Sequence, residues 1–113
     1  MKKYQLGEFE EIVLLTVGVL YNEAYGVAIR TEIENRLQRK VSIGAMQSAL
    51  RRLEEKDFLK SKSGEITENR GGKPKKYFFL TALGKKALDY NKQMRNELYN
   101  AIPEIAIDKL SYA

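Results

Sequence analysis

Apolar residues near the start of the chain repeat at the spacing of an α-helix. One face of this predicted helix carries Leu6, Phe9, Ile12, Val13, Thr16, Val17 and Leu20. The other side adds the apolar residues Leu14, Leu15 and Val19. Because a small domain covers one helix face with its own core, the second apolar face predicts contact with a partner subunit. A helix buried on all sides within one chain is the alternative.

Two further helices are predicted after a short polar turn over residues 21–24. The second helix spans residues 25–37, and its predicted core positions are Val27, Ile29, Ile33 and Leu37. Ser42 is a good N-cap for the third helix because its hydroxyl can accept a free backbone N–H. The apolar positions of this third helix are Ile43, Met46, Leu50 and Leu53. Its opposite side carries Gly44, Ala45, Ser48, Arg51 and Arg52, with Gln47 at the flank.

The pattern changes to that of a β-hairpin after residue 56. Residues 58–63 and 75–80 have strand-like bulk, and the loop between them contains Gly71 and Gly72. Thr81 then caps a long helix whose apolar stripe is Leu83, Ala87, Tyr90, Met94, Leu98 and Ile102. Pro103 interrupts this helix because it lacks an N–H and disfavours helical backbone at the residue before it. Residues 104–110 are expected to form a further short helical turn.

The composition limits the chemistry that this chain can perform. With 113 residues and 43% apolar content, the chain is expected to form one compact domain. It has no cysteine and no histidine, so thiolate metal sites and the commonest general base are missing. Its carboxylates are scattered, and the RGGK segment lacks the spacing of a phosphate-binding P-loop. We therefore expect no enzyme activity, no metal and no cofactor.

The positive charge is concentrated in the middle of the chain. The net charge is +5, and residues 39–76 hold eleven Lys and Arg against five Asp and Glu, which places +6 there and −1 elsewhere. Such a concentration is typical of a surface that binds a polyanion such as nucleic acid. A solvated basic face without a ligand is the alternative.

The N-terminal segment predicts a cytoplasmic protein that does not bind a membrane. Lys2 and Lys3 are followed within a few positions by acidic residues, so the apolar region of a signal peptide is missing. The most apolar stretch, residues 12–20, has about half the length of a membrane-spanning helix. It is interpreted as a buried helix.

The order of three helices and a hairpin is typical of a winged helix-turn-helix, whose third helix enters the major groove of DNA. The hairpin loop and return strand carry cations that can reach phosphates: Arg70, Lys73, Lys75 and Lys76. Gly71 and Gly72 allow close approach to the sugar-phosphate backbone, although simple turn geometry is an alternative reason for them. The predicted exposed face of the third helix has small side chains in its first two turns and basic side chains later, which suits entry into a DNA groove. Alternatively, Arg51 and Arg52 pair with Glu55 and Glu54 as surface charges.

Four segments together resemble the PadR family of bacterial transcriptional regulators, from Leu6 to about Leu88. These segments are LGEFEEIVLL (6–15), EAYGVAIRTEIE (23–34), VSIGAMQSALRRLEEKDFL (41–59) and RGGKPKKYFFLTALGKKAL (70–88). The resemblance implies a homodimer, usually a repressor, that binds a pseudo-palindromic operator. It also implies that the last helix packs against the first helix of the partner, as in the compact branch of the family. Expected interface residues are Phe9, Val13, Leu88, Met94 and Leu98.

Two departures from the family pattern limit what the resemblance implies. Gln47 stands where members often have tyrosine, and Arg51 replaces a common acidic residue, so the operator sequence does not transfer. Some compact members bind flat aromatic drugs between their dimerisation helices. This chain has no tryptophan and reads NKQMR over residues 91–95, which argues against an effector pocket of that type.

The sequence therefore predicts a mainly α (α+β) fold, with a winged helix-turn-helix over residues 1–80 and a long dimerisation helix over residues 81–113. The predicted function is sequence-specific binding of double-stranded DNA as a dimeric repressor. Expected base contacts are Gln47, Ser48 and Arg51. Expected backbone contacts are Tyr25, Ser42, Arg52, Arg70, Lys73, Lys75 and Lys76. Two alternatives stay open: a protein-interaction scaffold, and a sensor that binds a small-molecule effector at the dimer interface.

Overall fold

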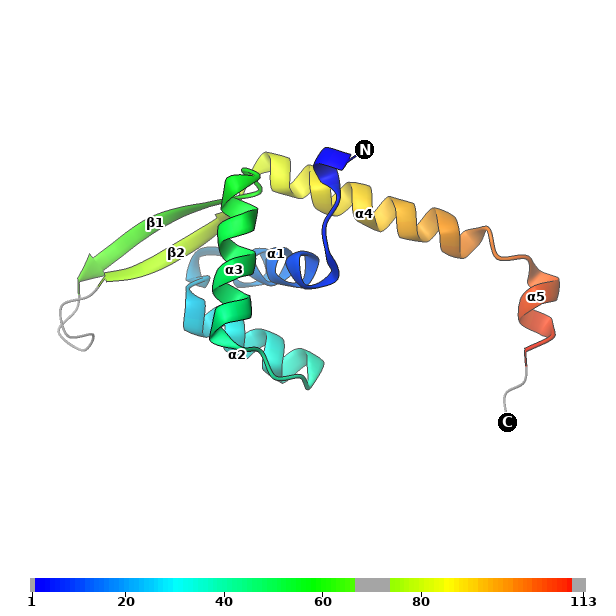
Figure 1. Ribbon diagram of the computed structural model, residues 1–113, viewed down its shortest axis with the longest axis horizontal. Helices are drawn as coiled ribbons and strands as arrows, with labels where there is room; N and C mark the ends of the chain where they lie inside the picture. The colour runs from blue at the N-terminus through cyan, green and yellow to red at the C-terminus, as the bar shows by residue number, and fades with distance from the viewer. Residues whose placement is uncertain (1, 67–73, 111–113) are drawn as a thin grey trace.

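The computed structural model describes residues 2–66 and 74–110, which form a helical body with a hairpin on one side and a long helix on the other (Figure 1). The helices of the body are α1 (Glu8–Leu20), α2 (Gly26–Leu37) and α3 (Ile43–Glu55). The hairpin consists of β1 (Leu59–Ile66) and β2 (Pro74–Leu80), and α4 (Ala82–Asn100) and α5 (Glu104–Asp108) follow it. Short 3-10 turns lie at Lys2–Tyr4 and Tyr21–Glu23. This order confirms the predicted winged helix-turn-helix.

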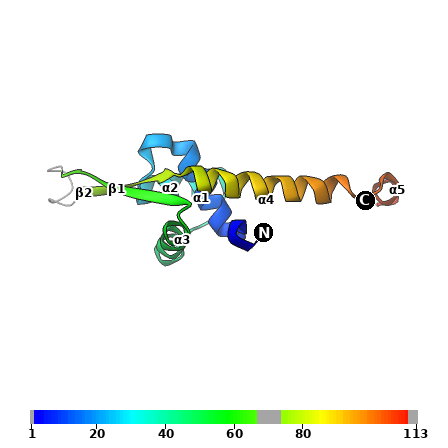
Figure 2. The ribbon, with the colours of Figure 1, turned by 90° about the horizontal axis from the view of Figure 1, so that it is seen from above.

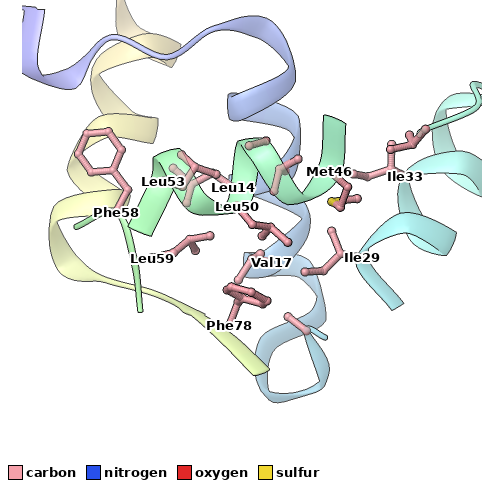
Figure 3. Close-up of a cluster of buried hydrophobic side chains, with 14 of the residues drawn as sticks. Leu14, Val17, Ile29, Ile33, Met46, Leu50, Leu53, Phe58, Leu59 and Phe78 are labelled. Carbon is pink, nitrogen blue, oxygen red and sulfur yellow. The ribbon is translucent and has the colours of Figure 1, made fainter. Parts of the chain in front are cut away.

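One hydrophobic core joins the three helices of the body to the base of the hairpin (Figure 3). Most predicted core positions are confirmed, including Ile29 and Ile33 of α2 and Met46, Leu50 and Leu53 of α3. Three predicted core residues are instead exposed, namely Val27, Leu37 and Ile43. They lie in the first or last turns of their helices, where the helix extends past the core. Leu14, which was assigned to the second face of α1, is fully buried, while Leu15 and Val19 are exposed.

Side-chain caps explain where α3 and α4 begin. The hydroxyl oxygen of Ser42 accepts a hydrogen bond from the Ala45 N–H at 3.1 Å, which confirms the predicted cap of α3. Thr81 caps α4 in the same way, because its hydroxyl oxygen accepts from the Gly84 N–H at 2.9 Å. Each cap satisfies a backbone donor that has no partner within the helix.

The hairpin is anchored to the start of α2. β1 and β2 pair in antiparallel register, with Leu59 opposite Leu80 and Ser63 opposite Lys76. The Phe78 N–H donates to the Ala24 carbonyl at 2.8 Å, which joins β2 to the segment just before α2. The wing therefore has a fixed position relative to the helical body. The predicted loop residues Gly71 and Gly72 lie outside the described residues.

The fourth helix extends away from the body on the side opposite the hairpin (Figures 1 and 2). The radius of gyration is 17.5 Å and the principal extents are 62 × 34 × 21 Å. A compact domain of this length has a radius of gyration of about 13 Å. Pro103 separates α4 from α5, which confirms the predicted interruption. The described residues therefore form an elongated molecule, and the last turn of α4 is exposed.

Candidate nucleic-acid interface

A groove of about 400 Å³ lies between α3 and the hairpin. Five of the residues predicted to contact DNA line it, and they come from α3, from β2 and from the N-cap of α2: Gln47, Arg51, Lys75, Lys76 and Tyr25. Its remaining lining residues are Gly26, Val27, Leu50, Glu54 and Phe78. Segments that are far apart in the sequence thus meet at one surface.

The α3 wall of the groove presents Gln47 and Arg51 to solvent. These residues are four positions apart, so they lie on the same side of the helix, and both are exposed. The alternative that Arg51 and Arg52 form ion pairs with neighbouring residues of α3 is not observed. Arg52 pairs instead with Glu10 of α1, and Glu54 pairs with Lys76 of the hairpin. The Arg51 guanidinium forms no ion pair within the described part of the chain.

Aromatic contacts hold a lysine at the other wall of the groove. The ring centroids of Tyr25 and Tyr77 lie 5.6 Å apart in an edge-on arrangement. The Lys75 ammonium lies 4.0 Å from the Tyr25 ring centroid, which is within cation–π range. An ammonium over an aromatic face keeps its charge and leaves its other side open to an anion. Lys75 and Tyr25 therefore form one preorganised part of the surface.

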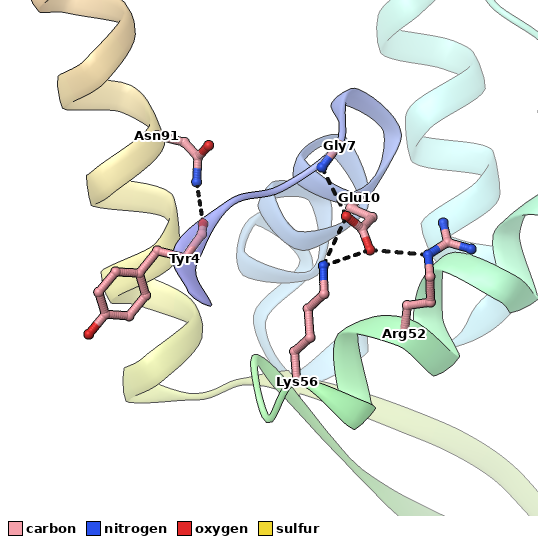
Figure 4. Close-up of polar contacts among 6 residues, drawn as sticks. All are labelled: Tyr4, Gly7, Glu10, Arg52, Lys56 and Asn91. Atoms are coloured by element: carbon pink, nitrogen blue, oxygen red, sulfur yellow. Dashed lines mark hydrogen bonds and ion pairs between the residues drawn. The ribbon is translucent and has the colours of Figure 1, made fainter. Parts of the chain in front are cut away.

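Arg52 is turned away from the groove and toward α1 (Figure 4). Its Nε donates to Glu10 Oε2 at 3.1 Å, and the Lys56 ammonium lies 3.2 Å from the same carboxylate. Glu10 also accepts a hydrogen bond from the Gly7 N–H at 2.9 Å. Burial alone raises the pKa of Glu10, but the hydrogen bonds from Gly7, Lys56 and Arg52 outweigh it and hold this pKa below its ordinary value.

The neighbouring carboxylate, Glu11, is also buried and forms an ion pair with Arg95 of α4. On the same side of the molecule, the Asn91 side-chain amide donates to the Tyr4 carbonyl at 2.8 Å. These contacts hold α4, as far as Arg95, against α1 and the N-terminal turn. Beyond Arg95, α4 makes no ion pair or hydrogen bond to the helical body among the described residues.

The remaining predicted DNA contacts are placed differently. Ser42 is exposed, and its hydroxyl oxygen is engaged in the cap of α3. Ser48 is half-buried and does not line the groove. Arg70 and Lys73 lie outside the described residues. Among the predicted backbone contacts that are described, only Tyr25, Lys75 and Lys76 are brought together in the groove.

Val27 and Glu54 are among the groove residues that were not expected at this surface from the sequence. Val27 was placed in the core, but its side chain is 66% exposed and lines the groove. Glu54 was considered only as a partner of a neighbouring arginine, yet it also lines the groove. The spacing of Gln47, Arg51 and Glu54, at four and three residues, is the signal that could have identified Glu54.

The residues predicted for a subunit interface differ in exposure. Val13 is fully buried in the core of its own chain, so its place in a subunit interface stays a prediction. Phe9 and Leu88 are half-buried against the core, and Met94 is half-buried. Leu98 is 68% exposed. Further exposed apolar residues follow it in the sequence: Tyr99, Ile102, Ile105 and Leu110.

No helix in the described ranges combines the length and apolarity needed to span a membrane. No group of three or more acidic side chains in these ranges is arranged to hold a metal ion.

Comparisons with known proteins agree with this geometry. A PadR-like transcription factor from Bacteroides fragilis is 28% identical with a TM-score of 0.71, over 86% of this chain and 88% of that one. A PadR family regulator from Clostridium difficile is 28% identical with a TM-score of 0.61, over 84% and 97%. RosR from H. salinarum shares the fold, at 21% identity and a TM-score of 0.67, over 88% and 83%. No curated protein matches. The model of the transcriptional regulator PadR-like family matches residues 14–90, and the chain belongs to this family.

Proposed function

We propose that this protein is a sequence-specific, double-stranded DNA-binding regulator that represses a nearby promoter by occupying its operator. The observation that carries the proposal is the groove in which Gln47 and Arg51 of α3 face Lys75 and Lys76 of the hairpin. Polar side chains on one helix face can read base edges, while cations beside them neutralise phosphates. In this proposal the protein acts in the cytoplasm by occupying its operator, and it performs no catalysis.

The α3 face supplies the proposed base contacts. The Gln47 amide can pair with adenine, and the Arg51 guanidinium can donate two hydrogen bonds to guanine. Arg51 suits this role because its guanidinium is exposed and makes no ion pair among the described residues. Ser48, at the half-buried edge of the same face, is the weakest member of the predicted set.

The opposite wall supplies the proposed phosphate contacts. The Lys75 ammonium is already held over the Tyr25 ring, so little side-chain freedom is lost when it meets a phosphate. Tyr25 is the N-cap residue of α2, whose N-terminal N–H groups also favour anions. These contacts place α3 on the duplex without reading its sequence.

A homodimer completes the proposal. Beyond Met94, the described part of the chain exposes several large apolar residues in and around α4 and α5. The elongated shape leaves this end of α4 free to pack against α1 of a second copy. Two copies related by a twofold axis would present two grooves, which matches the symmetry of a pseudo-palindromic operator.

Binding to the DNA upstream of the protein's own gene tests the proposed function. We expect affinity about a thousandfold or more above that for a scrambled duplex, with two chains bound per operator. The affinity should fall steeply with salt, because each neutralised phosphate contributes about −0.9 to the slope of log K against log salt. Fluorescence anisotropy and sedimentation measure these quantities. Equal affinity for both duplexes, or affinity insensitive to salt, would contradict the proposal.

The Arg51→Ala variant tests base reading separately from phosphate binding. We expect it to lose about 1–3 kcal/mol of binding free energy on the operator and to relax the preference for one base pair in each half-site. Affinities for a panel of operators with single base-pair changes measure this effect. Arg36→Ala is the matched control, because Arg36 is exposed on α2, pairs with Glu32 and does not line the groove. A loss that is equal on every duplex would remove Arg51 from the base contacts.

A further inference from the structure

Glu54 is an acidic residue in a groove whose other charged residues are cations. It lies in the last turn of α3, three residues after Arg51, and the groove is also lined by Lys75 and Lys76. The Glu54 side chain is 30% exposed, so solvent and ligands can reach it. A carboxylate at a surface that binds phosphates repels the ligand, and its presence there requires an explanation.

The two carboxylate oxygens of Glu54 have different partners. Oε1 lies 3.4 Å from the Lys76 ammonium of β2. Oε2 accepts a hydrogen bond at 2.7 Å from the hydroxyl of Ser61 in β1. One side chain of α3 therefore contacts both strands of the hairpin. The short bond to Ser61 keeps the carboxylate in place even when Lys76 moves away.

Lys76 is the cation whose availability depends on this carboxylate. Its side chain is 59% exposed, so a phosphate can reach its ammonium. A phosphate oxygen and a carboxylate oxygen are equivalent kinds of acceptor for an ammonium group. Before Lys76 can bind a phosphate, it must exchange one anion for the other. Lys75 has a neutral aromatic partner and makes no such exchange.

We propose that Glu54 competes with DNA phosphate for Lys76 and thereby lowers the affinity of the protein for duplexes of arbitrary sequence. This inference rests on the proposed function. Non-specific affinity comes almost entirely from phosphate contacts, so a cation held within the protein lowers it directly.

The Glu54→Gln variant tests this competition. A glutamine oxygen can still accept the Ser61 hydrogen bond, while the charge that holds Lys76 is removed. Since exposed ion pairs are weak, we expect a gain of about threefold to fivefold in affinity for a scrambled duplex at low salt. The gain should largely disappear when Glu54→Gln is made in a Lys76→Gln background, because the competition needs both partners. Fluorescence anisotropy measures the four proteins under identical conditions.

Glu55→Gln is the matched control, since it changes the net charge equally at an exposed residue that does not line the groove. Equal gains from Glu54→Gln and Glu55→Gln would show a general charge effect and overturn the inference. A gain that persists without Lys76, or a loss of affinity, would overturn it too. If the wild-type protein binds no duplex in a salt-dependent way, the proposed function itself fails.

Discussion

The Gly84→Ala variant is expected to be about 3 kcal/mol less stable than the wild-type protein. Alanine normally stabilises a helix relative to glycine, so the expected sign is reversed. A Cβ atom at Gly84 would lie 2.2 Å from the Phe58 carbonyl oxygen and 2.8 Å from Leu80 Cδ1. Phe58 is fully buried and its carbonyl accepts the Thr81 N–H, so this backbone has no room to move. α4 must shift away from the base of the hairpin.

Urea unfolding at a fixed protein concentration measures this effect, because association alters apparent stability. Gly44→Ala is the matched control, since Gly44 is also in a helix but a Cβ atom there meets nothing within 4 Å. We expect Gly44→Ala to raise the free energy of unfolding by roughly 0.5–1 kcal/mol. If Gly84→Ala were as stable as the wild-type protein, the close contact between α4 and the Phe58 backbone would be wrong.

The Glu10→Ala variant is expected to lose about 3 kcal/mol of stability at neutral pH. The substitution removes the acceptor for the Gly7 N–H, which belongs to the cap of α1. It also removes the acceptor for Arg52 and Lys56, which connects α1 to α3. Both cations are partly exposed and regain water, which keeps the loss below that of a fully buried ion pair. Chemical denaturation of both proteins measures the difference.

The loss caused by Glu10→Ala should depend on pH in a defined direction. Because the pKa of folded Glu10 lies below its ordinary value of 4.5, the charged carboxylate stabilises the fold fully above that value. This contribution falls as the pH decreases through the lower, folded pKa. The wild-type and Glu10→Ala proteins should therefore converge in stability in acid. A difference that grows on acidification would contradict the assignment.

Glu8→Ala is a suitable control for Glu10→Ala. Glu8 lies in the same first turn of α1 and contacts Arg39 at 3.2 Å, but its side chain is mostly exposed. Exposed ion pairs contribute about 0–1 kcal/mol, so we expect a small effect. Equal losses for the two variants would indicate a general effect of charge near the helix N-terminus.

The order and the ends of the elements could be predicted from the sequence because they depend on local chemistry. Ser42 and Thr81 cap their helices as expected, and Pro103 ends α4 as expected. Periodicity also identified most of the core. The core assignment was wrong for Val27 and Ile43. Helical periodicity shows which face of a helix is apolar, but it does not show where along the helix the core ends.

The contacts that shape the candidate site could not be predicted, because they join distant segments. Glu10 contacts Arg52, which is 42 residues later in the sequence, and Lys56, which is 46 residues later. Nothing in the local sequence pattern identifies these pairs. The sequence predicted that Arg51 and Arg52 both contact DNA, whereas the structure places Arg51 in the groove and pairs Arg52 with Glu10. Similarly, the placement of Lys75 over Tyr25 requires the hairpin to be fixed against the start of α2.

Glu10 and Glu11 are consecutive residues with separate partners, one in α3 and one in α4. Successive side chains point about 100° apart around a helix axis, so a single turn of α1 contacts two other helices. A displacement of α4 would therefore reach α3 through one turn of α1, so the positions of the long helix and of the α3 face are coupled over a very short path.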